Sequence, residues 1–185
     1  MGNQNSAAIN ETDKWTSLRS MKTPRTRFGA TAIGGRIYVA GCSNSSGFLS
    51  SAEVYHNKLK KWSKLPDMNE QRRGCAVISA NGKVHVIGGH KYYRGHTSLE
   101  IFDPATNKWT ALPDMMEDRG EYSACATGNK LYVFGGFSYG NRARSSAEMF
   151  DTTTKKWSSI PNMTTQQYRC AAVSVKDKIL FFWRT

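Results

Sequence analysis

The chain has 185 residues, of which 39% are hydrophobic, and its formal net charge is +12. It contains neither a long apolar run nor a basic and apolar leader, so we expect no transmembrane helix and no signal peptide. The charge permits contact with nucleic acid or anionic lipid. However, no run of five like charges occurs, and we interpret the charge as a solvated basic rim. We therefore expect a cytoplasmic protein with one hydrophobic core.

Three kinds of residue recur along the chain with one period. Tryptophans occur at Trp15, Trp62, Trp109 and Trp157, which are 47, 47 and 48 residues apart. Apolar runs with the same spacing open at Ile37, Val84, Leu131 and Ile179. Glutamates with this period occur at Glu53, Glu100 and Glu148. A fixed period of this size indicates a repeat architecture.

Four strands are predicted in each repeat. The first consists of small and apolar residues, as in 29–33, and its small side chains suit the place where the repeats lie closest together. The second is apolar at consecutive positions, as in 131–134, which is typical of a strand covered on both faces. Its end carries paired glycines, which permit a positive φ and a close approach of backbones. These glycines are Gly88, Gly89, Gly135 and Gly136. The third strand carries Glu-x-aromatic, and the fourth carries the tryptophan, which we expect to pack between repeats.

One histidine replaces an aromatic residue of the pattern. His85 stands in the second strand where the other repeats place Tyr38 and Tyr132. We interpret it as a core residue rather than as a metal ligand.

The motif as a whole resembles the kelch repeat. It consists of an apolar strand ending in Gly-Gly, then Glu-x-aromatic-Asp, and then a tryptophan six residues later, as in residues 131–136, 148–151 and 157. The pattern covers about residues 10 to 182. The resemblance implies an all-β, kelch-type β-propeller with one four-stranded antiparallel blade per repeat.

Three complete repeats and two incomplete ones are expected. The complete repeats are residues 23–68, 69–115 and 116–163. Residues 1–22 contain the last strand of a partial blade, and 164–185 form a partial repeat that lacks the glycine pair. Because kelch-type propellers close with more blades than this, we expect an open arc or a truncated product. Its exposed edge favours pairing, and another chain could supply the missing blades.

One face of such a propeller gathers arginines and tyrosines. The loops between the second and third strands lie on the same face as the loops between blades. Arg and Tyr are enriched in binding hot spots, and Arg grips carboxylates with two hydrogen bonds. In kelch-type adaptors, which the chain resembles, the arginine equivalent to Arg27 and Arg73 lines the peptide pocket. The candidate partner-binding residues are Arg27, Arg73, Arg119, Arg169, Tyr92, Tyr93, Arg94, Tyr139 and Arg142.

A second interpretation of the arginines stays open. Each repeat that supplies an arginine also supplies Glu53, Glu100 or Glu148. An internal Arg–Glu pair in each blade would hold strands together and would bind no partner.

Catalytic and metal-binding patterns are not found. His90 and His96 lack a third ligand, and no nucleophile–base arrangement or phosphate-binding loop can be nominated, so no metal and no cofactor is expected. The four cysteines are scattered, which favours free thiols in a reducing compartment. Gly2 lies in a short M-G-x-x-x-S pattern typical of N-myristoylation.

The function expected from the resemblance is protein–protein interaction without catalysis. The partner would be a protein or an acidic peptide, and the role that of a substrate-recognition adaptor, such as those of ubiquitin ligases, or of a cytoskeletal scaffold. No BTB or F-box segment is recognised, so an adaptor role would need another chain. Specific nucleic-acid binding is not expected. The alternative is a fragment of a kelch-type propeller enzyme, either an oxidase or a sugar-processing enzyme.

Overall fold

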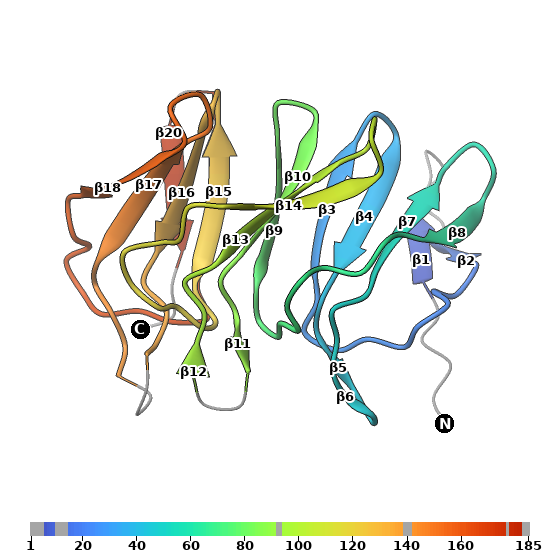
Figure 1. The fold of residues 1–185 in the computed structure, drawn as a ribbon, viewed down its shortest axis with the longest axis horizontal. Helices are drawn as coiled ribbons and strands as arrows, with labels where there is room; N and C mark the ends of the chain where they lie inside the picture. The colour runs from blue at the N-terminus through green and yellow to red at the C-terminus, as the bar shows by residue number, and fades with distance from the viewer. Residues whose placement is uncertain (1–5, 10–14, 92–93, 139–141, 177, 183–185) are drawn as a thin grey trace.

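The strands form small sheets, the blades, which lie side by side along an arc (Figure 1). The structure, a computed structural model, describes residues 6–9, 15–91, 94–138, 142–176 and 178–182. These residues contain strands and turns but no helix, so no helix that could cross a bilayer is found among them.

Three complete antiparallel blades account for most of the arc. The first consists of β3 (Gly29–Ile33), β4 (Arg36–Ala40), β7 (Ala52–His56) and β8 (Lys61–Lys64). The second consists of β9 (Ala76–Ala80), β10 (Lys83–Ile87), β13 (Leu99–Asp103) and β14 (Lys108–Leu112). The third consists of β15 (Ser123–Thr127), β16 (Lys130–Phe134), β17 (Ala147–Asp151) and β18 (Lys156–Ile160).

Half-blades of two strands lie at the two ends of the arc (Figure 1). The N-terminal half-blade is the hairpin of β1 (Ser6–Ile9) and β2 (Trp15–Leu18). The C-terminal one is the hairpin of β19 (Ala171–Val175) and β20 (Lys178–Phe182). The prediction of three full blades with partial blades at both ends is thereby confirmed.

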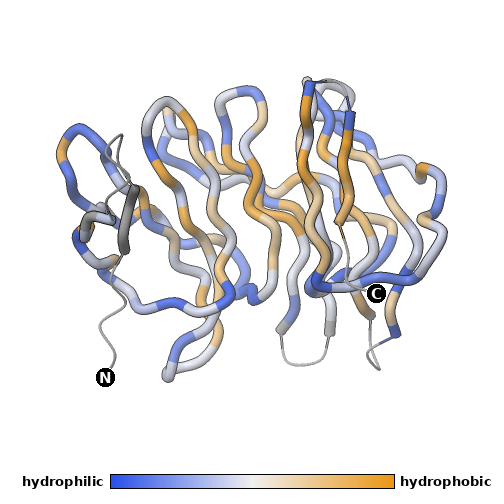
Figure 2. The backbone as a smooth tube through the Cα atoms, turned by 180° about the vertical axis from the view of Figure 1, so that it is seen from behind, coloured by the Kyte–Doolittle hydropathy of each residue, from blue (hydrophilic) through white to orange (hydrophobic). Residues whose placement is uncertain are grey.

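Apolar packing joins each blade to the next. Tyr38 and Val54 of the first blade share one cluster with Val86 and Phe102 of the second. An equivalent cluster joins the second blade to the third, and Figure 2 shows the apolar residues along the strands and the hydrophilic ones in the turns. Four consecutive residues of β10, from Val84 to Ile87, are buried, because neighbouring blades cover both faces of this strand.

Glycine pairs end the second strands where blades approach closely. Gly88 and Gly89 have φ angles of 49° and 91°, in the left-handed region. A Cβ atom added at Gly89 would lie 2.9 Å from the carbonyl oxygen of Arg73. Only a residue without a Cβ takes up this conformation and this space at low cost. Gly135 and Gly136 repeat the geometry in the third blade, with φ angles of 62° and 88°.

The tryptophans of the complete blades close the junctions between blades. Trp62 packs against Tyr55 with the two rings tilted by 53° and 5.2 Å between their centroids, and its indole N–H donates to the carbonyl oxygen of Arg19 at 2.8 Å. Trp109 and Trp157 donate in the same way to the carbonyls of Pro66 and Pro113. Trp15 differs, since it is 74% exposed, and the packing expected for it is not present.

His85 is a core residue, as expected, and it should make folding sensitive to acid. It is 1% exposed, and burial lowers its pKa from 6.5 to about 4. The unfolded chain therefore binds a proton near pH 6.5 that the folded chain binds only near pH 4. The stability contributed by the neutral ring is present above pH 6.5. It should be lost as the pH falls from 6.5 to about 4, by up to about 3 kcal/mol.

Urea unfolding across this pH range measures the effect. His85→Tyr, which introduces the residue found at the equivalent positions of the other repeats, should remove most of this loss. Equal pH dependence in the two proteins would contradict a role for His85.

Candidate functional site

Three arginines lie buried in the loops that precede the inner strands. Arg25, Arg72 and Arg119 are 1%, 0% and 0% exposed. Each pairs with the glutamate of the third strand in its own blade. The N–O distances are 3.2 Å for Arg25 with Glu53, 2.9 Å for Arg72 with Glu100, and 3.0 Å for Arg119 with Glu148. This is the internal pair that the sequence left open as the second interpretation.

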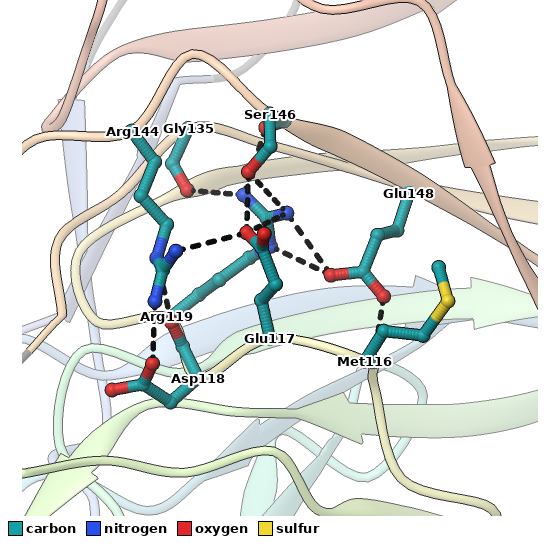
Figure 3. Close-up of polar contacts among 8 residues, drawn as sticks. All are labelled: Met116, Glu117, Asp118, Arg119, Gly135, Arg144, Ser146 and Glu148. Atoms are coloured by element: carbon teal, nitrogen blue, oxygen red, sulfur yellow. Dashed lines mark hydrogen bonds and ion pairs between the residues drawn. The ribbon is translucent and has the colours of Figure 1, made fainter.

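The pair in the third blade is held by a network of hydrogen bonds (Figure 3). Arg119 Nη1 donates to the carbonyl oxygens of Gly135 and Ser146, both at 2.8 Å. The second oxygen of Glu148 accepts the backbone N–H of Met116 at 2.8 Å. The ion pair thus ties the loop between two blades to the end of the second strand and to the third strand.

A second arginine reinforces the same loop. Arg144 contacts Glu117 at 3.0 Å and Asp118 at 2.6 Å, and Glu117 in turn contacts Arg119 at 3.1 Å (Figure 3). These contacts position the segment that runs into β15.

The structure separates Arg119 from the other candidate arginines. By the 47-residue period it is equivalent to Arg25 and Arg72, and its guanidinium is buried, so it offers no donor to a partner. Arg119 is therefore corrected from a partner-binding residue to a structural one. The sequence pattern did not distinguish the two kinds of arginine, because a buried and an exposed arginine lie only two residues apart in one loop.

A second set of positions, two residues further along these loops, forms a rim around the axis at which the inner strands converge. Its four equivalent positions are Arg27, Gly74, Glu121 and Arg169, with φ angles of 55°, 63°, 50° and 54°. The shared left-handed conformation shows that the four loops turn in the same way at this point. Together with Phe28, Cys75 and Tyr122, these residues line a hollow of about 310 Å³.

Glu121 joins two arginines across this hollow. Its carboxylate accepts from Arg27 Nη1 at 3.3 Å and from Arg169 Nε at 2.6 Å. The two arginine side chains are 50% and 59% exposed, whereas that of Glu121 is 12% exposed. The hydrogen bond with Glu121 raises the pKa of Arg169, so this guanidinium keeps its charge. Sequence reasoning missed Glu121, although counting one period from Gly74 would have found it.

A row of contacting aromatic residues extends from His90, beside Gly74, to Arg169 of the hollow. His90 lies 5.5 Å from Phe137, and Phe137 lies 6.3 Å from Tyr168, measured between ring centroids. Arg169 lies over the Tyr168 ring at 5.6 Å. Arg73 is half-buried beside His90, since their backbones form an antiparallel bridge. Burial lowers the pKa of His90, which favours its neutral form.

Short hairpins extend this face outward. The first consists of β5 (Ser43–Asn44) and β6 (Gly47–Phe48), and the second of β11 (His90–Lys91) and β12 (Arg94–Gly95). Both project from the lower side of Figure 1, beside the loops between blades. Arg142 is exposed, whereas only the backbone of Arg94 is described. Tyr92, Tyr93, Tyr139 and Gly2 lie outside the described residues.

The described residues offer little to a metal ion or a covalent reaction. Among them no group of three His, Cys, Asp or Glu side chains could hold a metal. All four cysteines are free, and burial raises the pKa of Cys75 and Cys125 to about 11, so these thiols stay protonated near neutral pH. The accessible groups of the site are guanidinium donors and aromatic rings, which suit a carboxylate or a phosphate.

Comparison with known proteins agrees with the blade count. The Kelch motif model matches residues 24–69, 71–116 and 118–164. The chain belongs to the kelch-repeat family. It is 52% identical to Kelch-like protein 41a of Danio rerio over 42 residues, which are 23% of this chain and 7% of that protein. It is 48% identical over 44 residues to an F-box/kelch-repeat protein of Arabidopsis thaliana, covering 23% of this chain and 12% of that protein.

A solved structure shares the fold of the kelch chain. The structure of YjhT superposes with a TM-score of 0.84 at 19% sequence identity, over 98% of this chain and 67% of YjhT. At this identity the likeness concerns the fold alone. The aligned segments span only a small part of the two curated relatives.

Breaking the buried pair of the third blade should be costly. Arg119→Ala leaves the Glu148 carboxylate buried without its guanidinium, and we expect the free energy of unfolding to fall by about 3–5 kcal/mol. Arg142→Ala removes an exposed arginine and serves as the control, with an expected change within about 0.5 kcal/mol. Chemical denaturation of both variants measures this difference, and a similar stability of the two would refute a structural role for Arg119.

Proposed function

We propose that this chain is a non-catalytic protein-interaction module that binds an acidic peptide segment over the axial hollow. The observation that carries the proposal is the pair Arg27 and Arg169, two half-exposed guanidinium groups on opposite sides of one carboxylate. Two arginines held this close to one another would repel unless an anion lay between them. Glu121 is one such anion and balances one of the two charges, so the cluster keeps a net charge of +1 that attracts a further anion.

The shape of the face supports a peptide rather than a small ion alone. The hollow of about 310 Å³ is lined in part by Phe28 and Tyr122, and Tyr168 lies against Arg169 at its edge, so aromatic rings supply apolar contact next to the charged donors. Aromatic residues beside arginines are the typical composition of an interface core. Arg73 and the exposed Arg142 extend the basic surface outward from the axis.

An adaptor or scaffold role is the corresponding cellular function that we propose. The name of the Arabidopsis relative joins kelch repeats to an F-box, which supports a module that presents a bound protein to another component. The free cysteines are compatible with a reducing, cytoplasmic location.

Removing the two rim arginines should weaken binding. A fluorescent library of peptides rich in Asp and Glu, with Asn and Gln counterparts, would identify a binder by fluorescence anisotropy. Arg27→Ala combined with Arg169→Ala should lower the affinity for this binder at least about tenfold, because both carboxylate-gripping groups are lost.

The control for this variant removes the same charge elsewhere. Lys58, in the turn between β7 and β8, and Lys156, the first residue of β18, are both exposed, and their double alanine variant should bind as the unaltered chain does. Equal losses in the two double variants would mean that net charge alone drives binding, and would refute a site at the rim.

Glu121 should compete with the peptide for the same guanidinium groups. Glu121→Gln keeps the shape of the side chain and removes its charge, so the affinity for an acidic peptide should rise about fivefold, the value of a typical exposed ion pair. The rise should vanish for the matched Asn and Gln peptide. A fall in affinity would show that Glu121 orients the arginines rather than competing for them.

A further inference from the structure

The two half-blades of the chain are complementary parts of one blade. Ser6 and Trp15 precede Glu53 and Trp62 by 47 residues, so β1 and β2 are equivalent to the third and fourth strands of a complete blade. β19 and β20 follow β15 and β16 by 48 residues and are therefore equivalent to the first and second strands. The half-blades lie at opposite ends of the arc, too far apart to join within one copy (Figure 1).

The C-terminal half-blade has an unpaired edge and an apolar face. In the complete blades the second strand pairs on both sides, whereas β20 pairs with β19 alone among the described strands. Along this hairpin Val173, Val175, Leu180 and Phe182 are 44% to 55% exposed. Beside it, an apolar hollow of about 320 Å³ opens against the third blade, where outer strands would pack.

The other end of the arc carries the matching surface. Ala30, Ala32 and Ile37 on β3 and β4 are exposed, because none of the described inner strands of the same copy covers this side of the first blade. In the middle of the arc the equivalent surfaces of the first and second blades pack directly on one another. If the C-terminal hairpin of one copy covered the first blade of another copy, the exposed apolar side chains of both would be buried.

Trp15 supplies a specific contact for the same arrangement. Trp62, Trp109 and Trp157 each donate an indole N–H to a carbonyl in the turn that ends the preceding blade. Trp15, by contrast, is 74% exposed. The position equivalent to the acceptors Pro66 and Pro113 is Pro161, at the far end of the arc, and it is exposed.

The two half-blades also match at the positions that hold the buried ion pair in the complete blades. The buried arginines Arg25, Arg72 and Arg119 have Gln167 as their equivalent in the next repeat. The carbonyl oxygen of Gln167 accepts the N–H of Gly136, just as the carbonyl oxygen of Arg119 accepts the N–H of Gly89. The positions of the paired glutamates begin with Ser6. Both partners of the ion pair are thus replaced by neutral residues at the two ends that would meet. A blade made of these halves would bury neither an unpaired arginine nor an unpaired glutamate.

We propose that copies of this chain associate head to tail, with β20 of one copy pairing antiparallel with β1 of the next to complete a four-stranded blade. The register follows the complete blades, in which Tyr38 lies opposite Val54 and Arg36 opposite His56. It places Leu180 opposite Ala7 and Lys178 opposite Ile9. Such a contact is heterologous, and it produces a ring if it closes or a chain of copies if it does not.

Sedimentation velocity of the 185-residue chain over a range of concentrations tests the association. We expect reversible assembly whose mass increases with concentration. Trp15→Ala should weaken it at least about tenfold, as truncation of a tryptophan anchor does. Met116→Ala is the matched control, because Met116 is 53% exposed in the loop between the second and third blades, in the middle of the arc, and should leave the association unchanged. A chain that stays monomeric throughout, or equal effects of the two substitutions, would overturn the proposal.

A double-mutant cycle tests the pairing of the two ends directly. Ser6→Glu alone and Gln167→Arg alone should each weaken association roughly tenfold, since each buries an unpaired charge. The double variant should recover it, because every completed blade would then contain an Arg–Glu pair like those of the three complete blades. Melting curves of all four proteins at low concentration monitor folding. Additive effects of the two substitutions on the dissociation constant would show that positions 6 and 167 do not meet, and would overturn the proposal.

Discussion

The buried ion pair between an interblade arginine and a third-strand glutamate is the interaction on which the rest of the arc depends. Apolar packing between blades is strong but not directional, and it would tolerate small rotations of one blade against the next. The arginine donates to carbonyl oxygens of the glycine end and of the third strand, as Arg119 does to Gly135 and Ser146. The glutamate also accepts backbone N–H groups of the loop that carries its arginine, as Glu100 does from Asn69 and Glu148 does from Met116. These directional contacts place each loop relative to the strands of its own blade.

The binding surface follows from this placement. Two residues beyond each of the buried arginines and their equivalent in the last repeat, the chain takes up a left-handed conformation, and at Arg27, Glu121 and Arg169 the side chain of that residue lies beside the axis. The repeated scaffold therefore displays different residues at equivalent places, and Arg27, Glu121 and Arg169 meet although 94 residues separate Arg27 from Glu121. The structural residue and the proposed binding residue lie two positions apart in the same loop, as Arg25 and Arg27 do. A change at one of them should alter stability, and a change at the other should alter binding.

The same regularity explains why the ends of the arc matter. Each blade in the middle is covered on both faces, whereas the first blade and the C-terminal hairpin each have one face that is partly uncovered and carries exposed apolar side chains. The neutral residues Ser6 and Gln167 occur at the two places where the ion pair is interrupted. The proposed association with a second copy therefore rests on residues of the scaffold and not on those of the binding face.

The sequence by itself determined the fold class, the number of blades and the order of strands, because the apolar runs, glycines and tryptophans recur with one period and each has a direct steric consequence. It also placed His85 in the core. Only the tertiary structure decided which arginines are buried, because Arg25 and Arg27 are too close along the chain for a pattern of residue types to separate them. It also decided that Glu121 lies between Arg27 and Arg169, and that Trp15 is exposed. These facts depend on which loops and blades become neighbours when the strands converge on the axis, and such neighbours are distant in the sequence.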